Sequence, residues 1–289
     1  MTKLEIIATF VTVIHITIIA YNPSSHHHNN FHLQSDCAIL KRISIQSHRH
    51  ELFTMKPIVL VLTAEHAVNT IPQSYQNLFQ NNPSVLETHD AMDFGTRAIA
   101  GFLHQNLVCE YHHPTVSRLL IDCNHHVHHP QLFSEFSHNL LPSEKQHLID
   151  TYYLPFRNHT EQTIQKHIDN GEQVLHLSIH SFAPSARGVV HNAAIGLLYD
   201  FRRHAEKEVA RAWYRLLCAE PPGYRVRLNY PYSGANHGFP HYLRKKHPES
   251  DYLGFHVETN QALLTDQTSL MMMTEALHHS INELLVFLA

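Results

Sequence analysis

Four apolar runs of the sequence each lead into polar side chains that could take part in catalysis. The runs are residues 57–63, 116–122, 173–180 and 253–259, and the polar groups at their ends are Glu65, His66, Asp122, Asn124, His180 and Glu258. If these runs are strands of one largely parallel sheet, their carboxyl ends meet at one edge, where such folds bind their ligands. A single histidine at a strand end is usually structural, but four such ends together predict a functional site.

Two histidines of this set, His66 and His180, predict a zinc site. Neutral imidazole nitrogens suit Zn²⁺, and a catalytic zinc usually takes three protein ligands and leaves one position open. The third ligand should lie near His66, and either Asp93 or Glu65 can serve. A carboxylate beside the metal but not bound to it would act as general base on the attacking water. Glu258 is the candidate, because it ends an apolar run that would hold it rigidly.

The elements that must position these side chains alternate along the chain. Continuous apolar, β-branched runs such as PIVLVLT indicate strands that are buried on both faces. We expect strands over residues 57–63, 116–122, 173–180, 194–199, 224–229 and 253–259, and helices over residues 89–107, 142–170, 201–218 and 265–288. This alternation predicts an α/β fold in which helices cover both faces of a mostly parallel sheet.

Composition excludes several other classes of protein. The chain has 289 residues, of which 43% are apolar and 16% charged, so wholesale disorder and coiled-coil architectures are excluded. A net charge of −4 argues against a nucleic-acid-binding surface. The 30 histidines far exceed the needs of one metal site, so most, including the run HHVHH at 125–129, are expected on the surface. The sequence has no C-x-x-C pair, phosphate-binding glycine motif or G-x-S-x-G motif.

The first 54 residues differ from the rest of the chain. Residues 6–20 are almost entirely apolar or threonine, and a polar, histidine-containing stretch follows them. Fifteen residues are too few to span a bilayer. We expect residues 1–54 to be an extension upstream of a start at Met55, with a single domain over residues 55–289 and a cytoplasmic location. The alternative is a signal segment with Lys3 before it and cleavage near Ala20, which would make the protein an exported one.

Seven segments resemble the N-formylglutamate amidohydrolase family, and they occur in that family's order. They are EHAVNTIP (65–72), HDAMDFG (89–95), SRLLIDCN (117–124), LHLSIHSF (175–182), IGLLYD (195–200), NYPYSG (229–234) and VETNQ (257–261). The family belongs to the zinc carboxypeptidase-like hydrolases. The resemblance therefore implies a three-layer α/β/α fold with a mixed, mostly parallel sheet, a zinc cofactor, and hydrolysis of an amide bond in an N-acyl amino acid.

Carried over by position, the resemblance implies His66 and His180 as zinc ligands and Glu258 as general base and acid. It implies that Arg118 polarises the scissile carbonyl or binds a substrate carboxylate. Carboxypeptidases have a glutamate ligand three residues after the first histidine, where this chain has Asn69, a poor zinc ligand. Asp93 is the first candidate for the third ligand, and Glu65 and Asn69 stay open as alternatives.

The predicted substrate contacts are less regular. Asn124 matches the D-x-N-R segment of the family, but His125 stands where an arginine is expected, and His191 stands where another is usual. Histidine cannot reproduce the bidentate fork by which arginine binds a carboxylate. Arg187 is close enough in sequence to replace one of them. Asn229 and Tyr232 lie in a segment that either forms a tight turn or closes over the substrate.

These observations predict a zinc-dependent amidohydrolase whose partner is a small molecule that carries a carboxylate. Nucleic acid is not an expected partner, and membrane association is not expected either. Two alternatives stay open. The first is a carboxypeptidase-like or cell-wall peptide hydrolase, which export would favour. The second is a non-catalytic metal-binding protein, which the histidine content would favour.

Overall fold

A computed structural model of the chain describes residues 56–186 and 188–289. The predicted extension, with its apolar segment at 6–20, lies outside the described residues. Within these residues no helix is both long and apolar enough to cross a membrane.

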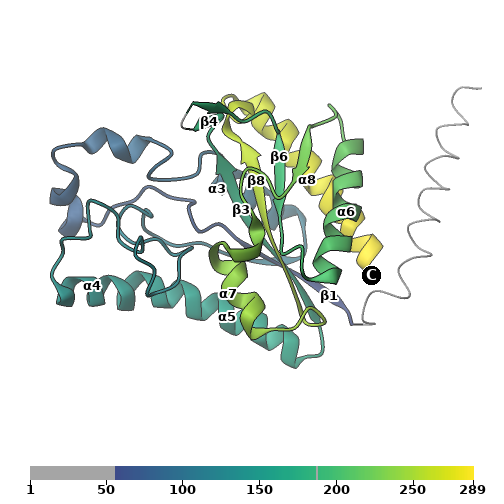
Figure 1. Cartoon of the computed structure of the whole chain (residues 1–289), viewed down its shortest axis with the longest axis horizontal. Coiled ribbons are helices and arrows are strands. Elements are labelled where there is room, and N and C mark those ends of the chain that lie inside the picture. Colours follow the sequence, from purple (N-terminus) through teal and green to yellow (C-terminus); the bar gives the residue numbers. More distant parts are fainter. Residues whose placement is uncertain (1–55, 187) are drawn as a thin grey trace, which may run out of the picture. The chain divides into compact units, whose positions relative to one another are not determined.

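The described residues build a six-stranded mixed sheet in the order β2-β1-β3-β8-β6-β7 (Figure 1). Its strands are β1 (Ile58–Thr63), β2 (Cys109–His112), β3 (Gln173–Phe182), β6 (Ile195–Leu198), β7 (Val226–Leu228) and β8 (Tyr252–Asn260). The first four in spatial order are parallel, whereas β6 runs antiparallel to β8 and parallel to β7. Two short strands, β4 (Ser185–Ala186) and β5 (Val189–Val190), form a separate hairpin after β3. The predicted mixed, mostly parallel sheet is confirmed.

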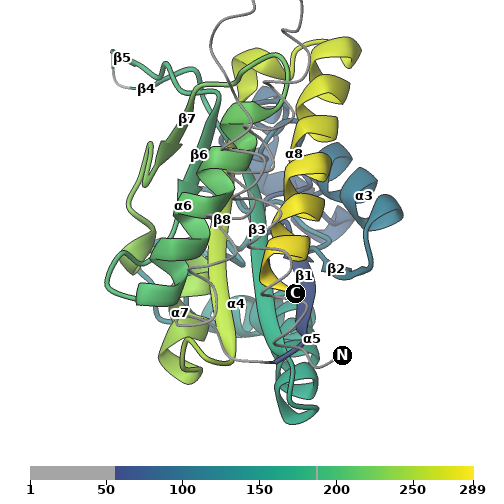
Figure 2. The same cartoon turned by 90° about the vertical axis from the view of Figure 1, so that its right-hand side faces the viewer.

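Helices cover both faces of this sheet, as predicted. One face packs on α3 (Thr96–Asn106), α6 (His204–Ala219) and α8 (Gln267–Leu288). The other packs on α5 (Leu154–Asp169), on α7 (Gly238–Lys246) and on a long connection around Leu120. A short helix, α4 (Pro142–Leu148), continues through a π-helical turn at Ile149–Tyr153 into α5. Figure 2 shows α6 and α8 in front of the strands and α4 behind them.

The two faces of the central strands differ in chemistry. Side chains alternate between the faces of a strand, with a period of two residues. In β3, Leu175, Leu177 and Ile179 belong to the core beneath α3, α6 and α8. The residues between them, His176, Ser178 and His180, lie on the opposite face and are also buried. In β8 the corresponding residues are Phe255 and Val257 on the first face, and His256 and Glu258 on the second. We call this second face the polar face.

The predicted strand over residues 116–122 is wrong. This segment forms turns, in which the amide groups of Leu120 and Ile121 donate to the carbonyl oxygen of Ser117. Its apolar side chains are nonetheless buried in the core beneath α5. A short apolar run reports burial and does not by itself distinguish a strand from a buried loop. The strand beside β1 is instead β2, which carries few apolar residues.

The predicted helix over residues 89–107 begins later, at Thr96. Residues before it form turns, and Gly95 precedes the helix with φ of 78°, a left-handed conformation that glycine adopts easily. Asp93 is therefore in a turn and not on the helix. This placement frees its side chain to face the sheet edge, where the amide group of Asp93 donates to the carbonyl oxygen of His66 at 2.9 Å. Helix α7 was not predicted.

Candidate active site

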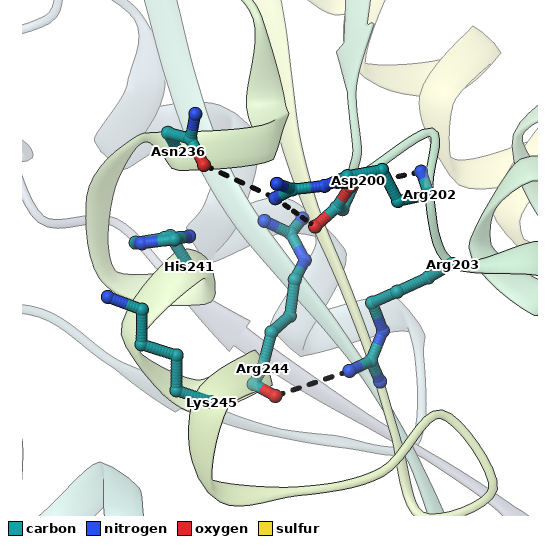
Figure 3. Close-up of a pocket in the computed structure, with 7 residues that line it drawn as sticks. All are labelled: Asp200, Arg202, Arg203, Asn236, His241, Arg244 and Lys245. Atoms are coloured by element: carbon teal, nitrogen blue, oxygen red, sulfur yellow. Dashed lines mark hydrogen bonds and ion pairs between the residues drawn. The ribbon is translucent and has the colours of Figure 1, made fainter.

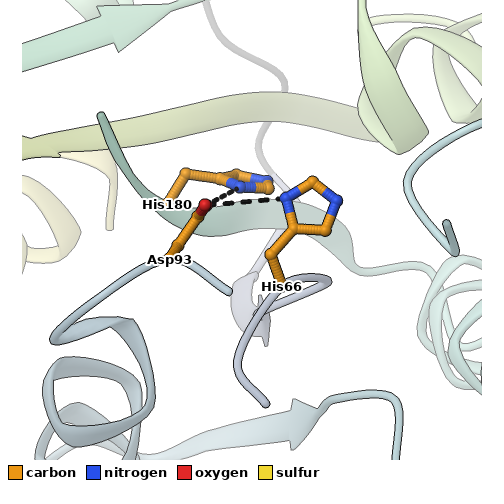
Figure 4. A group of neighbouring side chains, drawn as sticks. All are labelled: His66, Asp93 and His180. Carbon is orange, nitrogen blue, oxygen red and sulfur yellow. Dashed lines mark hydrogen bonds and ion pairs between the residues drawn. The ribbon is translucent and has the colours of Figure 1, made fainter. Parts of the chain in front are cut away.

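Three side chains that are distant in the sequence meet at the carboxyl edge of β1 and β3. His66, Asp93 and His180 are buried, and one potential ligand atom of each lies within 4.8 Å of the other two (Figure 4). The Nδ1 atom of His180 is 2.8 Å from Asp93 Oδ2, and His66 Nδ1 is 3.5 Å from the same oxygen. The structure thus brings together the two predicted histidines with Asp93. Of the other two candidates, Glu65 lies behind His180, and Asn69 donates to the carbonyl oxygen of Leu86.

The Nε2 atom of each histidine points away from the other cluster residues and contacts a further carboxylate. His66 Nε2 lies 2.9 Å from Asp122 Oδ1, and His180 Nε2 lies 3.2 Å from Glu65 Oε2. Histidines that ligate a metal typically donate their second ring N–H to a carboxylate, which fixes the tautomer and raises the basicity of the ligating nitrogen. Two Nδ1 atoms and one carboxylate oxygen facing one another form a donor set that suits Zn²⁺. The residues present fit such an ion.

The carboxylates next to the two histidines carry negative charge. Burial acts to raise the pKa of Asp93, but the charge of Arg118 and the hydrogen bonds of His180 and His66 outweigh it, and the pKa lies well below its usual range. The pKa of Asp122 is likewise lowered, since burial is outweighed by the charge and hydrogen bond of His66. Both carboxylates are therefore ionised at neutral pH. His180 lies between Asp93 and Glu65, whose hydrogen bonds raise its pKa against the effect of burial.

Glu258 lies beside His180 in the sheet and differs from the other carboxylates. The two residues are paired in register between β8 and β3. Its Oε2 atom is buried and has no hydrogen-bond partner among the described residues. Burial raises the pKa of Glu258 to about 7, the value at which a general base works best near neutral pH.

The backbone next to Glu258 leaves no room for a side chain. Gly196 of β6 pairs with Glu258, and a Cβ atom at Gly196 would lie 1.8 Å from the carbonyl oxygen of Tyr230 and 3.4 Å from Glu258 Cβ. Glycine is therefore required at this position, because the segment that contains Tyr230 passes directly over the strand.

Arg118 reaches the same cluster through contacts with the protein. Its Nη2 atom is 3.1 Å from Asp93 Oδ1, and its Nη1 atom is 3.0 Å from His66 Nδ1. Its other donors bind the carbonyl oxygens of His89 and Asp90. Arg118 thus links the turn that contains His89, Asp90 and Asp93 to His66.

The predicted substrate-binding residues have other partners in this structure. Asn124 Oδ1 accepts from the amide group of Phe239 in the first turn of α7, at 2.8 Å. Asn229 has a φ of 51°, and its Oδ1 accepts from the amides of Tyr199 and Gly234, so it organises a turn. The ring of Tyr232 is half exposed and stacks on His237. Arg187 lies outside the described residues. Contact of these residues with a substrate stays a prediction.

Several polar residues of the site were not predicted as site residues. Ser178 behind His180 and His256 two residues before Glu258 are the main ones. Asp122 was among the predicted strand-end residues, and the structure places it behind His66. The period-two spacing of His176, Ser178 and His180 in one strand was the available signal, because it places all three on one face.

A basic pocket of about 430 Å³ lies elsewhere, between the N-terminus of α6 and helix α7 (Figure 3). One of its lining residues, Asp200, follows β6. This strand runs antiparallel to β8, so the chain moves away from Glu258 as it passes from Gly196 to Asp200. Its arginines are engaged with the protein. Arg202 binds Asp200, Arg203 donates to the carbonyl oxygens of Arg244 and Tyr252, and Arg244 binds the buried Glu206. These contacts join α6, α7 and β8.

Comparison with known proteins assigns the chain to a family. The family model of N-formylglutamate amidohydrolase matches residues 58–265. The chain belongs to this family. The matched range includes His66, Asp93, His180 and Glu258. Membership in the N-formylglutamate amidohydrolase family indicates an enzyme that hydrolyses amides.

Solved structures give the same fold. A gene product of Agrobacterium tumefaciens, Atu2144, is 26% identical with a TM-score of 0.66, over 80% of this chain and 91% of that one. The N-formylglutamate amidohydrolase from Ralstonia eutropha is 16% identical with a TM-score of 0.60, over 82% of this chain and 96% of that one. No curated protein sequence matches this chain.

Proposed function

We propose that this member of the N-formylglutamate amidohydrolase family is a zinc-dependent enzyme that removes the acyl group from an N-acyl amino acid such as N-formylglutamate. The observation that carries the proposal is the pairing of two kinds of carboxylate at one sheet edge. Asp93 is ionised and faces two histidine nitrogens, whereas Glu258 beside it has a buried oxygen with no hydrogen-bond partner among the described residues and a pKa of about 7. Metal ligands and general bases need these opposite properties.

In this proposal His66, Asp93 and His180 hold the metal. A zinc ion supplies Lewis acidity, which polarises the acyl carbonyl and favours deprotonation of water. Glu258 takes the proton from the attacking water as the new carbon–oxygen bond forms. It then returns that proton to the amine nitrogen as the carbon–nitrogen bond breaks, which releases the carboxylic acid and the free amino acid. Burial suits Glu258 to both steps, because a pKa near 7 allows it to accept and to donate at neutral pH.

Arg118 has a role that depends on His66. A lone pair on a ring nitrogen serves one partner, and Arg118 Nη1 lies within hydrogen-bond distance of His66 Nδ1. If that nitrogen held a cation, the Nη1 group would lose this partner. It would then be able to donate to the carbonyl oxygen, on which negative charge develops. The contact between Nη2 and Asp93 keeps the guanidinium in place.

The amino-acid part of the substrate is the less constrained element. His125 stacks on His129 and lies 3.6 Å from Asp122, and His191 Nδ1 lies 2.9 Å from the carbonyl oxygen of Ala183. Neither offers the planar fork of an arginine to a substrate carboxylate. We therefore expect weaker discrimination among N-formyl amino acids than two arginines would give.

Metal analysis combined with an assay of formate release tests this function. The purified full chain should contain about one zinc per chain and should release formate from N-formyl-L-glutamate. His66→Ala should lose both properties, whereas His147→Ala, at an exposed histidine of α4, should keep both. N-acetyl-L-glutamate, N-formyl-L-aspartate and a dipeptide complete the substrate set. A wild-type protein that holds zinc and cleaves none of these amides would contradict the proposal.

A further inference from the structure

The buried carboxylate of Glu65, behind His180, collects hydrogen bonds from the polar face. The Thr63 hydroxyl donates to Oε1 at 2.7 Å, and the Ser178 hydroxyl donates to Oε2 at 2.7 Å. His180 Nε2 lies 3.2 Å from Oε2 and 2.9 Å from Ser178 Oγ. Each carboxylate oxygen of Glu65 thus accepts from a hydroxyl group, and Glu65 is an acceptor for the groups around it.

The hydrogen bonds continue from Thr63 into the interior of the sheet. Thr63 Oγ1 lies 2.7 Å from His176 Nε2, and His176 Nδ1 lies 2.6 Å from the hydroxyl oxygen of Tyr252. All of these side chains are buried. They connect β1, β3 and β8 across the sheet, at positions separated by up to 113 residues in the sequence.

Counting protons gives each of these bonds one direction. Thr63 has a single hydroxyl proton, which it donates to Glu65 Oε1, so Thr63 must accept from His176. Burial lowers the pKa of His176 to about 4, so its ring carries one proton at neutral pH, and this proton must be on Nε2. His176 Nδ1 is then an acceptor for the Tyr252 hydroxyl. Every donor in the row points toward Glu65, and His180 completes the set by donating from Nε2.

We propose that Tyr252, His176 and Thr63 form a positioning row that holds Glu65 against His180 Nε2, so that Nδ1 is the nitrogen of His180 presented to a metal. The inference rests on the metal site of the proposed function. His176 and Tyr252 contact neither the cluster nor a substrate, so they act as positioning residues through Thr63 and Glu65. His66 achieves the same orientation with one residue, Asp122, which a local turn holds.

The burial of Glu65 explains why several residues are needed to hold it. A buried carboxylate is costly unless its lone pairs are satisfied. Without a donor on Oε1, Glu65 would gain by rotation toward a nearby cation. Thr63 supplies that donor, and the His176 Nε2–H group, which occupies a lone pair of Thr63 Oγ1, directs the single hydroxyl proton toward Glu65. The row therefore holds Glu65 behind His180 and out of the ligand set.

The test uses pairs of variants in the full chain and measures Zn²⁺ affinity by competition with a chelator. His176→Leu removes the donor to Thr63 at similar volume, and Thr63→Val removes the hydroxyl without changing its shape. We expect both to weaken Zn²⁺ binding by about 10–100-fold, the usual effect of losing an outer partner of a metal ligand. His176→Gln, whose Nε2 can still donate, and Thr63→Ser, which keeps the hydroxyl, should stay within about threefold of wild type.

Two further readouts separate positioning from general loss of stability. In the zinc-loaded protein, ¹⁵N NMR should locate the His180 proton on Nε2 in the wild type, and Thr63→Val should broaden or shift this signal. The Co²⁺-loaded protein should change its visible spectrum in the same variants. Leu177→Ala, on the opposite face of β3, should lower stability and leave Zn²⁺ affinity and both spectra unchanged.

Unchanged Zn²⁺ affinity and spectra in a folded Thr63→Val or His176→Leu protein would overturn the inference. Zinc binding without amide hydrolysis in the wild type would instead contradict the proposed function and leave the positioning row standing. A wild type that binds no metal would overturn both.

Discussion

The two faces of β3 and β8 belong to the same strands but contribute differently to the protein. On one face, Leu175, Leu177 and Ile179 pack against three helices in an apolar core. On the other, His176, Ser178 and His180 are equally buried, yet each is held by a specific hydrogen-bond partner. The apolar face gains stability from area removed from water, which depends little on direction. The polar face gains orientation, because each buried polar group needs its partner in place.

Burial therefore has two different effects in this protein: it stabilises the fold on the apolar face and fixes side-chain orientation on the polar face. A buried leucine contributes to the free energy of unfolding, whereas its neighbour in the strand holds a specific hydrogen-bond partner in place. Substitutions on the two faces should therefore have separable effects, which the following experiments measure.

The largest effect is expected for Glu258→Gln. Glutamine keeps the size of the side chain but cannot take a proton from water, so turnover should fall by about 10²–10⁴-fold, the usual worth of general acid–base catalysis. Zinc content and substrate KM should stay near wild type, because Glu258 does not belong to the ligand cluster. Steady-state kinetics with metal analysis measures both. Turnover within a few-fold of wild type at full zinc content would remove Glu258 from the mechanism, and loss of zinc would make it a ligand.

Leu177→Ala should have the largest effect on stability among changes that spare the site. Truncation of a fully buried leucine removes apolar contacts and leaves a cavity, so the free energy of unfolding should fall by roughly 2–5 kcal/mol. Turnover per folded molecule should remain within about twofold. Urea unfolding monitored by circular dichroism gives the first quantity. Ser178→Ala, the next residue of the strand, is the matched comparison and should change zinc affinity more than stability. The reverse pattern would show that the two faces are not separable.

The sequence predicted the apolar face more completely than the polar one. The runs at 173–180 and 253–259 gave strands close to β3 and β8, because continuous apolar character with β-branched residues leaves few alternatives. The same reasoning failed at 116–122, whose burial comes from a turn-rich connection under α5. Helix α7 was not predicted from the sequence, because it is short and rich in basic residues.

The catalytic candidates and their positions at strand ends could be predicted from the sequence. Their hydrogen-bond partners could not. His66, His180 and Glu258 follow apolar runs, so their place at a sheet edge could be inferred from the chain alone. The contacts of Glu65 with Ser178 and of His176 with Tyr252 join residues 113 and 76 positions apart. Those pairs depend on strand order and register, which local patterns do not encode.

The raised pKa of Glu258 predicts a stability effect opposite to its effect on rate. Because the folded-state pKa, about 7, lies above the usual 4.5, the folded protein binds more protons than the unfolded chain between these values. The free energy of unfolding therefore falls as pH rises through this window. In the presence of a chelator, Glu258→Gln should be more stable than wild type at pH 8, by about 1–3 kcal/mol, and equal to it at pH 4.5.

Thermal unfolding of the metal-free protein at the two pH values measures this difference. An equal stability difference at both would show that Glu258 ionises normally in the folded state.

The smallest effect is expected in the histidine-rich loop. His126 and His128 are exposed, and the amide group of His128 donates to His126 Nδ1 at 3.2 Å, which an asparagine oxygen can replace. The double change His126→Asn and His128→Asn should alter the free energy of unfolding by less than about 0.5 kcal/mol. Tightly bound zinc should remain at one equivalent. Loss of several equivalents would favour a metal-storing protein over an enzyme.

The order of strands in the sheet also has a consequence for how the protein is synthesised. Strand β8 lies between β3 and β6, although it is the last strand in the chain. Until Tyr252–Asn260 has emerged from the ribosome, no strand can join the open edge of β3 to β6 and β7. Open edges of this kind invite pairing with other chains. The nascent protein therefore holds all three cluster residues before it has a complete sheet, and Glu258 arrives on the strand that closes the gap.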